Sequence, residues 1–231
     1  MNTEWRTYLV TQESRSAGRE TAAIAEAALA GGVDAVQLRE KGRPARERYE
    51  LGRRLRDLTA DAGVPLIVND RVDLAAALGA DGVHLGQSDL PVGVARERLG
   101  DEAIVGVSAS TVPEARAAAD AGADYLGAGA VYATDTKDVP AETNGVGPER
   151  VGAIADAVDL PVVGIGGIDA TNAAPVAEAG AAGVAVVSAV TAAPASATGA
   201  ALVASIPPIP TTGRSTASAI APTRSGPTPF V

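Results

Sequence analysis

Polar side chains of the types that bind phosphate alternate along one short segment of this chain. Gln37, Arg39 and Lys41 stand at every second position, with Leu38 and Glu40 between them. If the segment is the end of a β-strand, this alternation directs the amide and the two cations to one side. Such a group is suited to a diphosphate, although an isolated charge run is more often a solvated surface.

Two carboxylates come at similar points further along. Asn69 and Asp70 directly follow the apolar run PLIV, and Asp89 follows the next apolar run. Two carboxylates on neighbouring loops facing one diphosphate are a usual way to hold Mg²⁺. Each alone also fits a structural role, Asp70 as a helix N-cap and Asp89 as a turn residue before Pro91. The pair favours a metal site.

Hydroxyl groups and a lysine mark a third group. Ser108 ends another apolar run, and a long polar segment holds Thr134, Thr136 and Lys137. Closely spaced hydroxyls with an ammonium suit a phosphate, and a long loop here could close as a lid. The chain has only two lysines, Lys41 and Lys137, and both fall in these polar segments. Their placement favours phosphate binding over a surface role.

Two other segments and the sole histidine are weaker signals. The segment from Gly164 to Ile168 reads GIGGI, and Val187 and Ser188 end the last apolar run. Backbone N–H groups at such points can hold a phosphate, but GIGGI alone is also compatible with a plain tight turn. His84 lies in an apolar run, so we expect it to be packed or hydrogen-bonded rather than the catalyst.

Alternating strands and helices must position these groups. Short apolar runs alternate with alanine-rich amphipathic stretches, and the helices end at glycine. The predicted strands span 7–10, 34–38, 65–68, 82–85, 104–107, 124–128, 161–165 and 183–187. The predicted helices span 18–30, 46–62, 73–78, 92–99, 113–121, 148–157 and 170–179. Continuous apolar strands between helices indicate a parallel sheet, and eight such units favour the α/β class, as a single closed (β/α)₈ TIM barrel over residues 1–206.

Composition excludes several other classes of protein. With 19 basic and 28 acidic residues the formal charge is −9, which argues against a broad nucleic-acid-binding face. The sequence contains no cysteine, no membrane-length apolar run and no basic-then-apolar leader, so we expect a cytoplasmic protein. Residues 207–231 are rich in Pro, Ser, Thr and Gly without periodicity, and we expect a disordered tail.

Taken together, the motifs resemble the thiamine phosphate synthase family across residues 6–191. The resemblance rests on the order and spacing of YLVT, VQLREK, VNDRVDLA, GADGVHLGQSD, VGVSAST, ADYLGAGAVYATDTK, VVGIGGI and GVAVVSAV. It implies a TIM-barrel transferase that joins hydroxymethylpyrimidine diphosphate to a thiazole phosphate (or its carboxylated form), releasing diphosphate and thiamine phosphate. Its partners would be these two small phosphorylated substrates. One departure is Ala130, where the family commonly has proline.

The same resemblance implies a role for individual residues. One Mg²⁺ per subunit would be held by Asp70 and Asp89, and Arg39, Lys41 and Lys137 would stabilise the leaving diphosphate. The pyrimidine diphosphate would be bound by Gln37, Leu38, Arg39, Glu40, Lys41, Asn69, Ser108 and Lys137. The thiazole phosphate would be bound by Thr134, Asp135, Thr136, Gly167, Val187 and Ser188.

Three other functions fit the same fold. A thiazole tautomerase would need the phosphate loops but neither Lys41 nor the pair Asp70 and Asp89. A non-catalytic phosphate-binding barrel would bind without turnover. An aldolase or isomerase would need a Schiff-base lysine on a strand or a carboxylate base, whereas both lysines lie among phosphate-type residues.

Overall fold

Eight parallel strands form a closed ring in which every strand pairs with its neighbours in chain order. The computed structural model describes residues 5–134 and 144–191. The strands are β1 Thr7–Val10, β2 Ala35–Leu38, β3 Leu66–Asn69, β4 Gly82–Leu85, β5 Ile104–Ala109, β6 Tyr125–Ala128, β7 Val162–Ile165 and β8 Gly183–Val186. All eight strands predicted from the sequence are present, with ends that differ by at most two residues. The predicted (β/α)₈ barrel is confirmed.

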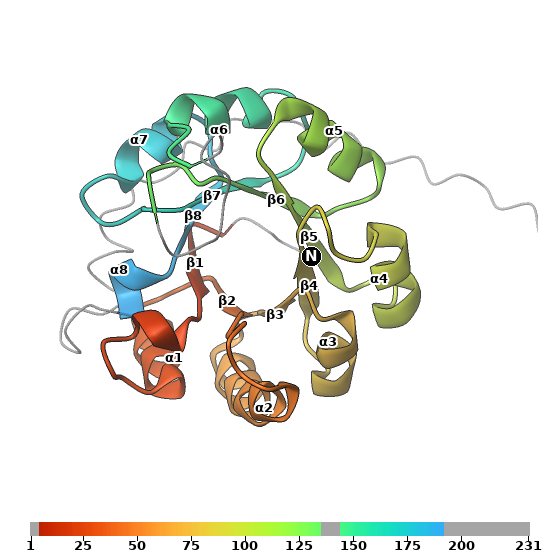
Figure 1. Cartoon of the computed structure of the whole chain (residues 1–231), viewed down its shortest axis with the longest axis vertical. Coiled ribbons are helices and arrows are strands. Elements are labelled where there is room, and N and C mark those ends of the chain that lie inside the picture. The colour runs from red at the N-terminus through yellow and green to blue at the C-terminus, as the bar shows by residue number, and fades with distance from the viewer. Residues whose placement is uncertain (1–4, 135–143, 192–231) are drawn as a thin grey trace, which may run out of the picture.

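Helices surround this ring on its outside (Figure 1). They are α1 Thr21–Ala30, α2 Ala45–Ala62, α3 Val72–Leu78, α4 Val92–Leu99, α5 Val112–Asp120, α6 Pro148–Ala155, α7 Ala173–Glu178 and α8 Ser188–Thr191, with a short 3₁₀ helix η1 at Glu13–Arg15. The sequence analysis missed η1 and α8, which are too short to show a helical period. The helix α5 begins with a capping box, in which Thr111 accepts from Glu114 N–H and the Glu114 carboxylate accepts from Thr111 N–H.

Two separate apolar clusters pack the molecule. The larger one lies between strands and helices and contains side chains such as Leu38, Leu55 and Leu126. The smaller one fills the inside of the barrel and includes Trp5 and Tyr125. Because successive strand residues point to opposite faces, each strand contributes to both clusters.

At the amino-terminal edge of the barrel, three aspartates each bind the start of the preceding strand. Asp34, Asp81 and Asp124 accept the backbone N–H of Thr7, Leu66 and Val105 at 2.8, 2.8 and 2.7 Å. We call Asp34, Asp81 and Asp124 the strand-start aspartates. Each also donates its own N–H to the carbonyl of the same residue, so β1–β2, β3–β4 and β5–β6 are each joined twice.

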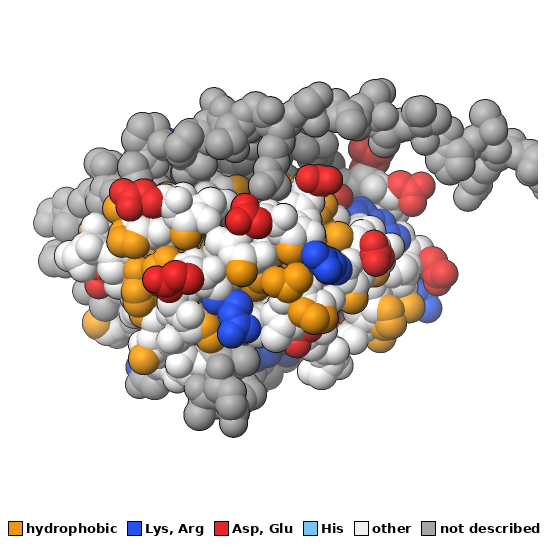
Figure 2. Space-filling model, turned by 90° about the horizontal axis from the view of Figure 1, so that it is seen from above, with side chains coloured by type: hydrophobic (Ala, Val, Ile, Leu, Met, Phe, Trp, Pro, Cys, Tyr) orange, Lys and Arg blue, Asp and Glu red, His pale blue; other side chains and the backbone are white. Residues whose placement is uncertain are grey.

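The outer surface seen over one side of the barrel carries interspersed charges of both signs among small hydrophobic side chains (Figure 2). No helix within residues 5–134 and 144–191 has the length and apolar character needed to cross a membrane. The predicted domain limit at residue 206 and the predicted tail over 207–231 lie outside the described residues.

Candidate active site

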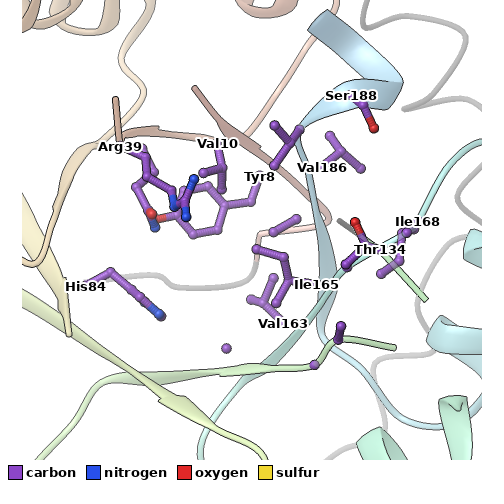
Figure 3. Close-up of a pocket in the computed structure, with 18 of the residues that line it drawn as sticks. Tyr8, Val10, Arg39, His84, Thr134, Val163, Ile165, Ile168, Val186 and Ser188 are labelled. Atoms are coloured by element: carbon purple, nitrogen blue, oxygen red, sulfur yellow. The ribbon is translucent and has the colours of Figure 1, made fainter. Parts of the chain in front are cut away.

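A pocket opens at the carboxyl-terminal ends of the barrel strands. It takes in about 800 Å³, including open solvent at its mouth. Arg39, Tyr8 and His84 lie at one side of it, and Thr134 and Ser188 lie at the other, with apolar side chains between them (Figure 3). In barrels of this kind the loops at this end build the active site.

The strand β2 directs two of its predicted site residues into this pocket. Gln37 and Arg39 are both buried and line it. The Arg39 guanidinium donates from Nη1 to Gln12 Oε1 at 2.6 Å, which holds it against the loop after β1. Leu38, between them, points the other way into the outer apolar cluster. The predicted alternation therefore holds for Gln37 and Arg39.

Glu40 is turned toward the protein interior. Its carboxylate accepts from Glu13 N–H at 2.9 Å and from the Thr21 hydroxyl at 3.1 Å, and its side chain is buried. The backbone of Glu40 has a positive φ of 29°, so the chain turns here. In this structure the Glu40 carboxylate joins the loop after β2 to the loop after β1, while the prediction that Glu40 binds substrate remains a prediction.

Lys41 lies beyond this turn and reaches the neighbouring loop. Its Nζ is 2.8 Å from Asp70 Oδ2, and its side chain is half exposed. The Asp70 carboxyl is also within hydrogen-bonding reach of the Asp89 carboxyl. Asp89 in turn accepts the N–H of Gly86 at 2.6 Å. The two aspartates expected to share a metal therefore do meet, with an ammonium beside them.

Burial, hydrogen bonds and neighbouring charges shift the pKa values of Asp70 and Asp89 in opposite directions. Burial raises the pKa of Asp70, but hydrogen bonds with Lys41 and Asp89 outweigh burial and hold that pKa below its usual value. Burial also raises the pKa of Asp89, whereas the hydrogen bond from the Gly86 N–H lowers it. The neighbouring Asp70 carboxylate raises the pKa of Asp89 further, so that pKa lies above its usual value. The two carboxyls therefore differ, since the Lys41 ammonium favours the ionised form of Asp70 while the Asp70 carboxylate disfavours that of Asp89.

Asn69 carries a buried side-chain donor, its Nδ2, that has no hydrogen-bond partner among the described residues. A buried amide without a partner is costly, so such a group is often one that a ligand satisfies. Asn69 is the last residue of β3 and directly precedes Asp70.

A line of hydrogen bonds runs below the polar side of the pocket. Gln37 Nε2 donates to the Tyr8 hydroxyl at 2.8 Å, and the Tyr8 hydroxyl lies 3.1 Å from that of Tyr125. His84 bonds through Nδ1 to the Tyr125 hydroxyl and through Nε2 to the Ser108 hydroxyl, both at 2.9 Å. The expectation of a hydrogen-bonded His84 thus agrees with the geometry, and His84 also lines the pocket.

The far side of the pocket is formed by the loops after β6, β7 and β8. Gly166 and Gly167 follow β7 with φ of 105° and 64°, conformations that favour glycine, and both line the pocket with Val187 and Ser188. Thr134 is anchored by Asn144, which accepts its N–H at 3.0 Å and donates to its carbonyl at 3.1 Å. The remaining predicted residues Asp135, Thr136 and Lys137 lie outside the described residues.

Comparison with known proteins identifies this arrangement. A family model described as thiamine monophosphate synthase matches residues 7–190, from the start of β1 into α8. The chain belongs to the thiamine monophosphate synthase family. The family predicted from the sequence motifs is therefore confirmed, and with it an enzyme of the transferase class.

Individual members of the family are highly similar. The thiamine-phosphate synthase of Natronomonas pharaonis is 62% identical over 179 residues, covering 78% of this chain and 84% of that protein. The thiamine-phosphate synthase of Haloquadratum walsbyi is 63% identical over 179 residues, covering 78% of this chain and 80% of that protein. A solved thiamine phosphate pyrophosphorylase from Pyrococcus furiosus superposes with a TM-score of 0.79 at 38% identity, covering 87% of this chain and 95% of that one.

The donor set of this family member fits Mg²⁺. Asp70 and Asp89 offer two carboxyl groups, and within residues 5–134 and 144–191 no group of three or more His, Cys, Asp or Glu side chains could hold a metal. Mg²⁺ is usually bound through one or two carboxylates, with water and substrate phosphate as its other ligands. Asp70 and Asp89, within hydrogen-bonding reach of each other, supply two such carboxyl groups.

Sequence reasoning missed two tyrosines of the site. Tyr8 and Tyr125 line the pocket from β1 and β6, and both are fully buried. A signal was present, because each occupies an inward position of its strand in a chain with only 3% aromatic residues. It was not usable alone, since a tyrosine within an apolar strand is equally expected in a core.

Proposed function

We propose that this protein is a thiamine phosphate synthase that joins 4-amino-2-methyl-5-(diphosphooxymethyl)pyrimidine to hydroxyethylthiazole phosphate, or to its carboxylated form. The products would be thiamine phosphate and diphosphate, and with the carboxylated thiazole phosphate CO₂ would also be lost, its place on the ring carbon being taken by a proton from solvent. The observation that carries the proposal is the contact of Lys41 with the pair Asp70 and Asp89, next in sequence to the unpartnered Asn69 amide, at the same end of the barrel as the pocket that Gln37 and Arg39 line. We place its action in the cytoplasm, on small phosphorylated substrates.

The polar side of the pocket would hold the pyrimidine diphosphate. Gln37 and Ser108 would bind the pyrimidine, and Arg39, Lys41, Asn69 and Lys137 would bind the diphosphate. One Mg²⁺ per subunit, held by Asp70 and Asp89, would supply positive charge to the departing diphosphate. When that substrate enters, Lys41 can exchange its bond to Asp70 for a phosphate oxygen, because its side chain is half exposed.

The opposite side would hold the thiazole phosphate. Thr134, Gly167, Val187 and Ser188, which line this side of the pocket, would bind it together with Asp135 and Thr136. The bond between the pyrimidine methylene carbon and the diphosphate oxygen breaks with both electrons going to diphosphate. The thiazole nitrogen then gives its lone pair to that carbon. This nitrogen carries no proton, so the reaction needs no general base, and catalysis rests on positioning and electrostatics.

A diphosphate-release assay tests this proposal. We expect release only when both substrates and Mg²⁺ are present, with thiamine phosphate formed in equal amount. Binding of the pyrimidine diphosphate without turnover would indicate a regulatory phosphate-binding barrel and would overturn the proposal. Isomerisation of a thiazole phosphate in the absence of the pyrimidine would indicate a tautomerase instead.

A further inference from the structure

The hydrogen bonds below the pocket form one unbroken chain from β2 to β5. Its members, in spatial order, are Gln37, Tyr8, Tyr125, His84 and Ser108, and each bond measures 2.8–3.1 Å. They come from five different strands, β2, β1, β6, β4 and β5. The function proposed above uses the two ends of the chain, Gln37 and Ser108, but gives no role to the three residues between them.

Close packing fixes the three rings of the chain. A Cβ on Gly106 would lie 2.1 Å from the Tyr125 ring, and a Cβ on Gly127 would lie 2.9 Å from the His84 ring. Both positions must therefore be glycine for the rings to occupy this space. Trp5 packs against Tyr8 and Tyr125 with ring centroids 5.3 and 5.0 Å apart. Rings held in this way have little freedom to seek other partners.

The amide of Gln37 sets the direction of every bond in the chain. An amide nitrogen only donates, so the Tyr8 hydroxyl accepts at that end. Burial raises the pKa of both phenols, so each keeps its proton and can donate once. In the arrangement that uses both phenol protons within these bonds, Tyr8 donates to Tyr125, and Tyr125 donates to His84 Nδ1.

The donor and acceptor at the Ser108 end of the hydrogen-bond chain follow from the same reasoning. When Nδ1 accepts, the proton of a neutral imidazole lies on Nε2, which donates to the Ser108 hydroxyl. The Ser108 proton is then available to a ligand, as is the Gln37 amide oxygen at the other end. If the Gln37 amide were turned over, every bond would reverse, the His84 proton would lie on Nδ1, and Ser108 would donate to Nε2.

We propose that Tyr8, Tyr125 and His84 are positioning residues that fix the hydrogen-bond polarity of the substrate pocket, with an acceptor at Gln37 and a donor at Ser108. The choice of ligand rests on the proposed function. An aminopyrimidine offers an amino donor to Gln37 Oε1 and a ring nitrogen acceptor to the Ser108 hydroxyl. The corresponding oxo-pyrimidine has a carbonyl in place of the amino group. Its carbonyl oxygen would lie against the Gln37 amide oxygen, and because both groups only accept hydrogen bonds, this compound would bind poorly.

The polarity can be measured without any substrate. His84 is the sole histidine of the protein, so the untagged protein labelled with ¹⁵N-histidine gives a single pair of ring nitrogen signals. We expect the proton on Nε2 and none on Nδ1. A proton on Nδ1 in the wild-type protein would overturn the proposal.

Reversing one end of the chain should move this proton. In Gln37→Glu a carboxylate that only accepts replaces the donating amide, so Tyr8 would donate to it and all later bonds would reverse. We expect the His84 proton to move to Nδ1, although Gln37 does not touch His84. Gln12→Glu is the matched control, because Gln12 bonds to Arg39 and takes no part in the hydrogen-bond chain. In this variant the proton should stay on Nε2.

An unprotonated Nδ1 in folded Gln37→Glu would contradict the proposal. If that variant does not fold, Tyr125→Phe tests the same chain, since it removes the donor to Nδ1. The Nδ1 signal should then move to the position of a nitrogen without a hydrogen bond. Tyr49→Phe, which changes an exposed tyrosine on α2, should leave it in place. An unmoved Nδ1 signal in Tyr125→Phe would overturn the proposal.

Substrate selectivity tests the consequence for function. In Tyr8→Phe the Gln37 amide loses its partner and can turn over, so the preference in kcat/KM for the amino- over the oxo-pyrimidine diphosphate should fall by about tenfold or more. Tyr49→Phe should keep the wild-type preference. An unchanged preference in Tyr8→Phe would overturn the proposal. A wild-type protein that turns over neither compound would refute the proposed function, whereas the histidine measurement would still stand.

Discussion

Asp70 has an uncommon backbone conformation for a residue with a side chain. Its φ is 62°, in the left-handed region, where aspartate and asparagine are better tolerated than other non-glycine residues. Its N–H donates to the His84 carbonyl at 2.8 Å, which holds the turn to the next strand. This conformation places the carboxyl beside Lys41 and Asp89 at the end of β3. Backbone strain of this kind is commonly found where function requires a particular side-chain position.

Asp70→Asn and Asp89→Asn should each lower turnover and raise the Mg²⁺ concentration needed for half-maximal activity. Asparagine keeps the size and tolerates the backbone of Asp70, so each change removes charge alone. Mutating a group that only hydrogen-bonds to a metal ligand lowers metal affinity or activity by roughly 10–100-fold. The loss in turnover on changing a ligand itself should be at least as large. A Mg²⁺ titration of initial rates measures both effects.

The control for this pair is Asp73→Asn, which changes an exposed aspartate on α3 bound to Arg71. We expect its Mg²⁺ dependence to match the wild type. A wild-type Mg²⁺ titration curve in Asp70→Asn or Asp89→Asn would remove that residue from the metal site.

Lys137 is expected to act as a compact point charge on the leaving diphosphate. A guanidinium is larger and planar, so Lys137→Arg should lower kcat more than it weakens thiazole phosphate binding. Lys137→Ala should cost more, about 2 kcal/mol or above in activation free energy, as for the loss of an oxyanion-type donor. Steady-state kinetics on both substrates separates kcat from KM.

Wild-type kcat in Lys137→Ala would contradict this role and would leave Arg39 and Lys41 to stabilise the diphosphate. A harmless Lys137→Arg together with an impaired Lys137→Ala would show that charge matters there but its shape does not.

At the scale of elements, consecutive strands are joined in pairs, and the last pair lacks one contact. The strand-start aspartates precede β2, β4 and β6, and the matching residue before β8 is Ala182. Its N–H donates to the Val162 carbonyl at 2.8 Å, just as the N–H of Asp81 donates to Leu66. The β7–β8 pair therefore repeats the backbone geometry of the others without the carboxylate.

Ala182→Asp should supply the missing contact. The new carboxylate would accept the Val162 N–H and raise the free energy of unfolding by about 1 kcal/mol, the net value of a typical hydrogen bond. Denaturant unfolding at neutral pH measures the change. Ala182→Asn is the control, because asparagine has the size of aspartate but no charge. It should raise the free energy of unfolding by less than Ala182→Asp. A stability at or below that of the wild type would show that β7 and β8 do not reproduce the geometry of the other pairs.

The same periodicity explains how much could be predicted. The alternation of apolar runs and amphipathic stretches was sufficient for all eight strands, because a parallel barrel repeats one unit with two clear signals. It also placed Gln37, Arg39, Asp70 and Asp89 at strand ends, where they are found.

The contacts that the sequence did not reveal join residues far apart along the chain. Nothing near Glu40 in the sequence shows that its carboxylate binds Glu13 N–H and Thr21, because those partners are 27 and 19 residues away along the chain. The chain through Tyr8 and Tyr125 joins strands 117 residues apart in sequence. Such pairings become visible only once the barrel is closed.

For the whole molecule, residues beyond 206 should be dispensable. Deleting residues 207–231 is expected to leave activity and the thermal midpoint nearly unchanged, because that segment has no core-forming pattern. Thermal unfolding and diphosphate release compare the shortened and full chains. A loss of several degrees, or of most of the activity, would show that the segment contacts the barrel.

The pairing of strands by the strand-start aspartates has a consequence for dividing the gene in two. A break after Gly100, between α4 and β5, separates none of the joined pairs, whereas a break after Gly79 would separate β3 from β4. The backbone pairing of β4 with β5 would hold the two fragments together, and Arg96 would add to it, since it reaches from α4 to the Asp124 carboxylate at 2.6 Å. The first fragment would carry most of the groups assigned to the pyrimidine diphosphate, and the second most of those assigned to the thiazole phosphate. Co-expressed fragments that reassemble would let each substrate's half of the site be varied separately.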